Sequence, residues 1–187
     1  MQDERCEPDW EQDVVQRLRL RQRPALGELA SRFGIQLKKI AYIQLGDLDA
    51  AEDVAQETLI AAWDAAKRSG ENTQLRPWLF GILFNQCRKY RRSLWRRWRR
   101  ERRAAQRGGE REDHDSQQDE QLTVLRKALM QLDERQRAVI TLRYEQGLSI
   151  DETAEALMLP AGTVKSRTHA AIERLRKTMR FQIDEQR

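Results

Sequence analysis

Three acidic side chains repeat at helical spacing in the first third of the chain. Asp49, Asp53 and Glu57 stand four residues apart, so a helix places them on one side, and Gln56 lies beside them. A carboxylate pair can act as general acid and base, but no companion acid, base or ligand set accompanies Asp53 and Glu57. Like charges at this spacing repel one another. Two interpretations remain: a solvated acidic face, or an acidic strip that docks on a basic partner.

Basic side chains dominate a later segment. Residues 88–103 hold ten Arg or Lys in sixteen positions, with Trp95 and Trp98 between them. Acidic residues then dominate 110–120, so the sign of the charge reverses. This composition predicts a linker with little stable structure over 96–121. Such a linker is either a solubilising spacer or a tether that lies in a charged channel.

No catalytic or metal site is predicted. Cys6 and Cys87 form no CxxC pair, and with only His114 and His169 they offer no zinc-binding spacing. The sequence also lacks a nucleophile–base pair and a phosphate-cradling loop. We therefore expect no enzyme, no cofactor and no small-molecule substrate. Cys87 lies in an apolar helical segment and is expected to be a buried thiol.

The bulk properties narrow the class of protein. The chain has 187 residues, of which 39% are hydrophobic and 35% charged, so its cores are small. A net charge of +5 fits a polyanionic partner. No apolar run has the length of a membrane span, and the acidic N-terminus is unlike a signal peptide, so we expect a cytoplasmic protein. Scarce Gly and Pro, with helical periodicity throughout, predict an all-α fold.

The periodicity also predicts the helices that position these side chains. Residues 1–24 are interpreted as a polar tail, with room for one short helix that ends at Pro24. Longer helices are predicted over 25–45, where Gly34 allows a break or kink, over 48–67 and over 75–94, with a polar loop over 69–74. The pattern resumes at 122–132. Asp133 is the expected N-cap of the next helix, with Gln136 at the capping-box position and Gly147 as the C-terminal signal.

Residues 149–176 have the pattern of a helix-turn-helix. Ser149 and Glu152 form a capping box at the start of a short helix, and Pro160 ends it. In the second helix the inward residues are Val164, Thr168, Ala171, Ile172 and Leu175, and the outward ones are Ser166, His169 and Ala170, flanked by Lys165, Arg167 and Arg174. A packed hairpin with a solvated face has the same geometry. The basic outer face favours a recognition helix in a major groove.

Three segments resemble one family in the right order. EDVAQETLIAAW at 52–63, LRPWLFGILFNQCRKYRR at 75–92 and LDERQRAVITLRYEQGLSIDETAEALMLPAGTVKSR at 132–167 are similar to bacterial RNA polymerase sigma factors. They look most like the two-domain extracytoplasmic-function group. The pairing of the first segment with a downstream GTVKSR helix is specific, whereas other helix-turn-helix regulators share GTVKSR alone.

The resemblance implies two small helical domains joined by a charged linker. A sigma-2-like domain would cover 25–95, after the tail of 1–24. The linker would cover 96–121 and thread toward the RNA exit path of the polymerase. A sigma-4-like helix-turn-helix domain would cover 122–180, and 181–187 would be a C-terminal tail.

The resemblance also implies partners and site residues. Core RNA polymerase would receive the acidic strip on the clamp helices of its largest subunit, and its second-largest subunit would contribute the flap. Promoter DNA is the second partner, and a membrane-bound anti-sigma protein is the third. The implied polymerase-binding residues are Asp49, Asp53, Gln56 and Glu57. The implied −10 residues are Asn72, Asn85, Arg88, Lys89, Arg91 and Arg92. The implied −35 residues are Arg143, Thr163, Lys165, Ser166, Arg167 and His169.

The chain departs from the family at a few positions. His169 stands where many members have an aromatic or hydrophobic residue, and Ala170 where many have a basic one, so the −35 sequence is open. Met158 replaces the usual glycine after the first helix of the motif. The alternative function is a helix-turn-helix regulator that binds DNA as a dimer without docking on polymerase. It leaves the acidic strip unexplained, and no coiled-coil repeat supports dimerisation.

Overall fold

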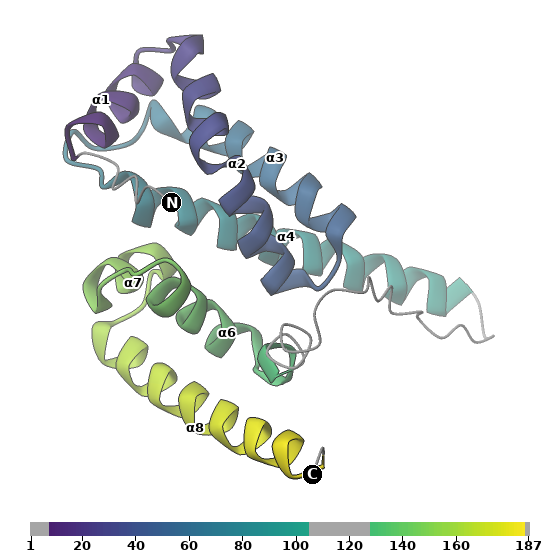
Figure 1. The fold of residues 1–187 in the computed structure, drawn as a ribbon. Coiled ribbons are helices and arrows are strands. Elements are labelled where there is room, and N and C mark those ends of the chain that lie inside the picture. The colour runs from purple at the N-terminus through teal and green to yellow at the C-terminus, as the bar shows by residue number, and fades with distance from the viewer. Residues whose placement is uncertain (1–7, 105–127, 186–187) are drawn as a thin grey trace.

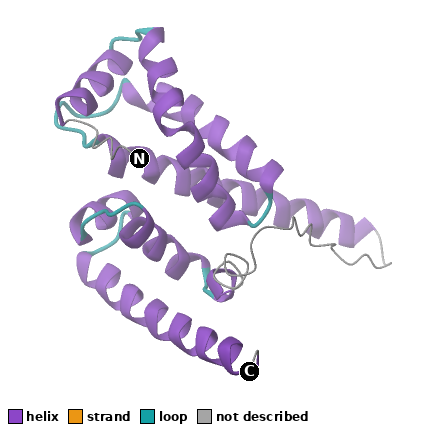
Figure 2. Cartoon of the chain, in the orientation of Figure 1, coloured by secondary structure: helices purple, strands orange, loops and turns teal. Residues whose placement is uncertain are grey.

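The computed structural model describes residues 8–104 and 128–185, and every regular element in these ranges is a helix (Figures 1 and 2). The elements are α1 (Pro8–Arg19), α2 (Arg23–Leu45), α3 (Leu48–Ala66), α4 (Leu75–Ala104), α6 (Glu134–Ile140), η1 (Thr141–Glu145), α7 (Ile150–Leu157) and α8 (Ala161–Glu185). The all-α prediction is confirmed. None of the helices within these ranges combines the length and apolar character that a membrane crossing requires.

The first domain packs α1 to α4 around one apolar core (Figure 1). Phe33 and Leu37 of α2 meet Phe80 and Leu83 of α4 in this core, and none of the four is more than 3% exposed. The side that α3 buries consists mainly of small residues, which let its backbone approach its neighbours closely. These buried residues are Ala50, Ala51, Val54, Ala55, Thr58, Ala62 and Ala66.

Local signals set the boundary between α2 and α3. Gly46 ends α2 in the left-handed conformation, with φ of 77°, and donates its N–H to the Tyr42 carbonyl. The side chain of Asp47 then accepts a hydrogen bond from the Ala50 N–H and caps α3. The helix predicted over 48–67 is therefore confirmed to within one residue. Gly34 introduces no break, and α2 runs through it.

The N-terminal boundary of the first domain was predicted wrongly. Residues 8–24 are not a tail, because Val14, Val15 and Leu18 of α1 are at most 2% exposed and belong to the common core. The expected short helix is present, but it ends at Arg19. Pro24 stands in the first turn of α2, where its missing N–H is tolerated.

The linker boundary was also predicted wrongly. Helix α4 continues to Ala104, so residues 96–104, assigned to the linker, are helical. Arginine is a good helix former, and no Gly or Pro occurs between Gly81 and Gly108. The remaining linker residues, 105–121, lie outside the described ranges, as do the first residues of the helix expected at 122–132.

The second domain comprises the helical turn at 128–131, α6, η1, α7 and α8. Asp133 caps α6 by accepting from the Gln136 N–H at 2.8 Å. Gln136 does not complete the expected capping box, because its side-chain oxygen is buried without a hydrogen-bond partner among the described residues. Gly147 has a φ of 67°, as its role after η1 requires. Helix α8 extends to Glu185, beyond the expected end at 180.

The two domains pack against one another, which the prediction of two small domains joined by a charged linker did not include. Helix α7 contacts α4, and α6 contacts α2. In Figure 1, α4 and the C-terminal end of α2 lie on the side of the first domain that faces the second domain. Four buried residues of the second domain, Ala138, Leu142, Leu148 and Ala156, join the apolar core of the first. The chain is therefore closed on itself.

Candidate functional site

The acidic strip lies on the outer side of α3. Asp49, Asp53, Gln56 and Glu57 are all exposed, while the opposite side of the helix is buried. Within the described part of the chain, none of the three carboxylates has an ion-pair partner. The neighbouring Glu52, by contrast, pairs with Lys38 of α2 at 2.5 Å. The strip therefore presents negative charge that the described residues do not neutralise.

A basic face follows the middle of α4. Arg88, Lys89 and Arg92 are exposed, and the half-buried Asn85 accepts a hydrogen bond from Arg88. We call these four residues the α4 basic face. Their helical spacing puts them on one side of α4. Cationic side chains around an amide can hold phosphates and a base edge of nucleic acid.

Two of the residues implied for the −10 element lie elsewhere. Asn72 is exposed in the loop before α4. At about 1.5 Å per residue, the start of α4 is roughly 15 Å along the helix axis from Asn85, so Asn72 lies apart from the α4 basic face. Arg91 is half-buried and does not share the α4 basic face. Its guanidinium donates to the Gln44 carbonyl of α2 and pairs with Glu134 of α6 at 2.7 Å. The structure therefore brings four of the six residues together.

The helix-turn-helix is built by the local signals that the sequence contains. The Glu152 N–H donates to the Ser149 hydroxyl at 3.1 Å, and the Ser149 N–H donates to the Glu152 carboxylate at 2.6 Å. Met158 adopts the left-handed conformation, with φ of 52°, that glycine provides in many turns. Val164 and Ala171 are fully buried, and Ala171 packs with Leu132 and Ile140. These contacts fix which side of α8 faces outward.

The outward side of α8 carries most of the implied −35 residues. Lys165, Ser166 and His169 are exposed, and we call them the recognition face. Thr163 and Arg167 are half-buried beside it. The Ser166 hydroxyl donates to the Thr163 carbonyl at 3.1 Å, a bond within the first turns of the helix. This side can enter a major groove without moving any core residue.

Arg143 lies apart from the recognition face, in η1. It is half-buried and its guanidinium donates to the Leu148 carbonyl, so it stabilises the turn before α7. It also lies near Glu152, whose pKa is lowered chiefly by the hydrogen bond from the Ser149 backbone and, to a smaller extent, by Arg76 and Arg143. In this conformation the Arg143 guanidinium is therefore hydrogen-bonded within its own domain.

Cys87 has no reactive character. Burial raises the pKa of its thiol to about 12, so the thiol stays protonated at neutral pH. The prediction of a buried thiol is confirmed.

The sequence interpretation missed the polar residues between the domains. Arg137 is only 7% exposed and Gln44 only 1%, and both take part in contacts between the domains. A weak signal was present, since Gly81 interrupts an apolar helix and an isolated helical glycine commonly marks a close approach. Gly81 meets the Ala156 backbone in the structure.

Comparisons with known proteins agree with this architecture. The chain matches the Sigma-70 region 2 family over residues 29–97 and the Sigma-70 region 4 family over residues 128–177. It is 38% identical over 140 residues to the ECF RNA polymerase sigma factor SigL of Mycobacterium tuberculosis, covering 72% of this chain and 77% of SigL.

Two solved structures have a similar fold over nearly the whole chain. CnrH in complex with the cytosolic domain of CnrY superposes with a TM-score of 0.69 and 26% identity, covering 90% of this chain and 96% of CnrH. The sigma factor RpoE of Bartonella quintana, in complex with the anti-sigma factor NepR, gives 0.68 and 26%, covering 82% and 96%. The present chain belongs to the sigma-70 family, in its extracytoplasmic-function (ECF) group.

Proposed function

We propose that this chain is an alternative sigma factor, which binds core RNA polymerase, recognises the −35 and −10 promoter elements and directs transcription initiation. One observation carries the proposal: region 2 and region 4 follow one another in a single chain, and each has an exposed face of the charge that its partner requires. The protein acts by binding and positioning and is not an enzyme.

The acidic strip on α3 is the proposed polymerase-docking surface. Its carboxylates are exposed and without ion-pair partners in the described chain, so they are available to a basic surface such as the clamp helices of the largest subunit. Docking would also relieve the repulsion between Asp49, Asp53 and Glu57. The flap of the second-largest subunit is the proposed second contact.

The α4 basic face is the proposed contact with the −10 element. Arg88, Lys89 and Arg92 would neutralise phosphates of the non-template strand, and Asn85 would meet a base edge. Asn72 in the loop before α4 would contact an extruded base farther along that strand.

The recognition face of α8 is the proposed contact with the −35 element. Lys165 at its start would bind phosphate or a guanine edge, with Ser166 and His169 toward the groove. Thr163, Arg167 and Arg143 would support it from the flanks. Small residues such as Ala170 leave room for readout by the shape of the DNA.

An anti-sigma protein is the proposed regulator, since the similar sigma factor RpoE of Bartonella quintana is seen in complex with the anti-sigma factor NepR. Because its other partners are polymerase and chromosomal DNA, the protein would act in the cytoplasm.

Run-off transcription tests the proposal. Core polymerase and the purified chain are incubated with genomic fragments, and the transcripts are sized and sequenced. We expect transcripts with defined starts that depend on the chain, and the starts give the promoter elements. If the chain binds the fragments but core polymerase makes no transcript with a new start, the alternative is correct: the chain is a helix-turn-helix regulator that does not dock on polymerase.

A further inference from the structure

The C-terminal end of α4 carries charged side chains that none of the contacts proposed above uses. Residues 95–104 form the last turns of this helix, and we call them the α4 extension. Figure 1 shows it projecting beyond the other helices of the first domain. Cys87 is the last buried residue of α4 among those described, whereas Trp95, Arg96 and Arg99 are exposed. These three side chains therefore lie outside the core.

The charge of the α4 extension is strongly one-sided. Residues 96–103 contain six arginines and a single acidic residue, Glu101. Arg96 stands four residues after Arg92 and three before Arg99, so like charges are neighbours along the helix and repel one another. Binding to a polyanion removes this repulsion. The charge pattern thus complements a phosphate backbone.

Helical spacing places the exposed cations of the extension on the same side of α4 as the α4 basic face. At about 100° per residue, Trp95, Arg96 and Arg99 share an arc of about 120° with Arg88 and Lys89. We call the combined set the α4 stripe: Asn85, Arg88, Lys89, Arg92, Trp95, Arg96 and Arg99. The stripe is about 21 Å long at about 1.5 Å per residue. One strand of duplex DNA presents roughly six phosphates over this length, which suits the cations of the stripe.

Trp95 has a specific relation to Arg99. It is 55% exposed, and the Arg99 guanidinium lies over its ring at 5.0 to 5.1 Å from the centroid, the latter being the measured distance. A helix that only improves solubility needs no exposed tryptophan, whereas a ring under a guanidinium restricts the rotamers of the arginine. Arg99 also covers one face of the ring, which leaves less of it to stack on an unpaired base. The arrangement therefore favours phosphates of duplex DNA over single strands.

The position of the extension along α4 indicates which DNA it meets. Asn72 lies in the loop before α4, and the extension is at the opposite end of the helix. In the proposed function Asn72 contacts an extruded base, so the melted DNA lies toward the start of α4. The other end of the −10 element adjoins intact duplex, and this is the side that the extension faces.

We propose that the α4 extension binds the phosphates of double-stranded DNA without reading its sequence, in the segment that adjoins the −10 element on the side away from Asn72. Arg96 and Arg99 contact phosphates, and Trp95 is a positioning residue for Arg99. The inference rests on the proposed function only for its place on the promoter. Binding to duplex of any sequence follows from the charge and exposure of the extension itself.

Arg96→Gln with Arg99→Gln is the principal test, and Lys67→Gln with Arg68→Gln is its matched control. Each pair removes two positive charges at exposed positions, and glutamine forms helices about as well as arginine. Lys67 and Arg68 follow α3 and precede the start of α4, which is roughly 30 Å along the helix axis from Arg96. Binding of the full chain to a scrambled duplex of about 30 base pairs is measured by fluorescence anisotropy at several salt concentrations.

The principal variant should lose two phosphate contacts. We expect the slope of the logarithm of the binding constant against the logarithm of the salt concentration to fall by about 1.8, and binding at about 0.1 M salt to weaken roughly sixtyfold. The control should match the natural chain. A duplex with the mapped promoter should lose affinity by the same factor as the scrambled one, because phosphates carry no sequence information. An unchanged slope, an equal loss in the control, or a loss confined to promoter DNA would overturn the proposal.

Trp95→Leu and Trp95→Phe test the positioning role. Leucine removes the ring beneath Arg99, so we expect duplex binding to weaken by about threefold. Phenylalanine keeps an aromatic face and should retain most of the affinity. Both variants should keep the thermal midpoint of the natural chain, because Trp95 is exposed. If phenylalanine loses as much affinity as leucine, Trp95 does not position Arg99 through its ring.

Competition experiments separate duplex DNA from other occupants. Unlabelled duplex should displace the labelled duplex at lower concentration than single-stranded DNA or RNA of the same length. If a single strand competes better and the principal variant loses affinity for it, the extension binds single strands. If the principal variant keeps all nucleic-acid binding and loses only co-purification with core polymerase, the extension binds protein. Either result overturns the duplex assignment. These measurements need neither polymerase nor a promoter, so a failed run-off experiment would leave the inference standing.

Discussion

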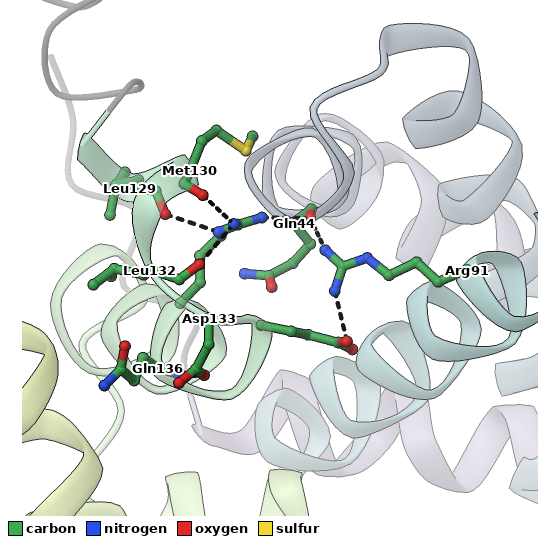
Figure 3. A network of polar contacts seen from close by, with 9 residues as sticks. Gln44, Arg91, Leu129, Met130, Leu132, Asp133 and Gln136 are labelled. Carbon is green, nitrogen blue, oxygen red and sulfur yellow. Dashed lines mark hydrogen bonds and ion pairs between the residues drawn. The ribbon is translucent and has the colours of Figure 1, made fainter. Parts of the chain in front are cut away.

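The two domains meet at a polar cluster around Gln44, Arg91 and Arg137, the domain joint, which uses the same kinds of side chain as the exposed faces but in the opposite way (Figure 3). In the joint, Arg137 is 7% exposed and has four carbonyl acceptors, one of them from the other domain. On the recognition face, Lys165 is exposed, and on α3 the carboxylates of the acidic strip have no ion-pair partner in the described chain. Arg137 is thus buried and hydrogen-bonded within the chain, whereas the charges proposed to meet polymerase and DNA are exposed.

This difference has a physical reason. A buried cation is tolerated only if its N–H groups are paired, so Arg137 has a fixed position and a structural role. An exposed charge interacts weakly with its own chain through water and keeps its capacity for an external partner. Charged side chains with a structural role are therefore paired inside the chain, and those proposed to bind a partner are exposed. Arg91 is half-buried and falls between these two groups.

The largest expected effect is on polymerase binding. Replacing Asp53 and Glu57 by arginine reverses the acidic strip, so we expect co-purification with core polymerase to fall by more than about a hundredfold, or roughly 3 kcal/mol. Thermal stability should change little, because both side chains are exposed. The control is Asp151→Arg with Glu155→Arg on α7, which has the same spacing and charge change. Equal loss in both double variants would contradict the assignment of α3.

The next effect is on stability. Arg137→Leu removes the donor of four carbonyl interactions in a buried place, so we expect the free energy of unfolding to fall by about 3 kcal/mol. For a chain of this length the midpoint of thermal unfolding should drop by about 10 °C. Arg135→Leu, at an exposed position of the same helix, is the control and should change the midpoint by far less. A midpoint shift no larger than that of the control would show that these hydrogen bonds of Arg137 do not stabilise the chain in solution.

A smaller effect is expected on duplex binding. Lys165→Ala should reduce the slope of the logarithm of the binding constant against the logarithm of the salt concentration by about 0.9, which corresponds to the loss of one phosphate contact. Arg167 is half-buried, so its replacement by alanine should reduce the slope by no more than this. Lys177→Ala, near the far end of α8, should leave the slope unaltered. If neither Lys165→Ala nor Arg167→Ala changes it, α8 is not the recognition helix.

The smallest effect concerns the helix-turn-helix itself. Ser149→Ala removes the N-cap of α7 and should cost about 1 kcal/mol. Because the pKa of Glu152 is lowered in the folded chain, its stabilisation is present above the unfolded pKa and is lost as pH falls through the folded pKa. Glu152→Gln keeps the capping geometry without the charge. The difference in thermal midpoint between pH 7 and pH 3 should therefore be smaller in this variant, and an equal difference would contradict a role for the Glu152 charge.

Much of the fold follows from local signals in the sequence. Asp133 and Ser149 were predicted as helix caps, and the structure confirms the helix starts that follow them. The acidic strip was also predictable, because spacing on one helix determines which side chains share a face. Its exposure followed from the small buried residues on the opposite side of α3.

The packing between the domains was not predictable in this way. Ala156 of α7 is buried against Gly81 of α4, a contact between residues far apart in the sequence. Periodicity shows which side of a helix is apolar but not which distant helix covers it. The family resemblance grouped Arg91 with Arg88 and Arg92, and only the tertiary structure places it beside Gln44 and Glu134.

Photocrosslinking from Gln56 in an initiating complex tests the central claim most directly. Gln56 is exposed in the middle of the acidic strip, so a photoreactive residue there disturbs no internal contact. While run-off transcript is being made, we predict adducts on the clamp helices of the largest polymerase subunit. Abundant transcript with no adduct on that subunit would contradict the account.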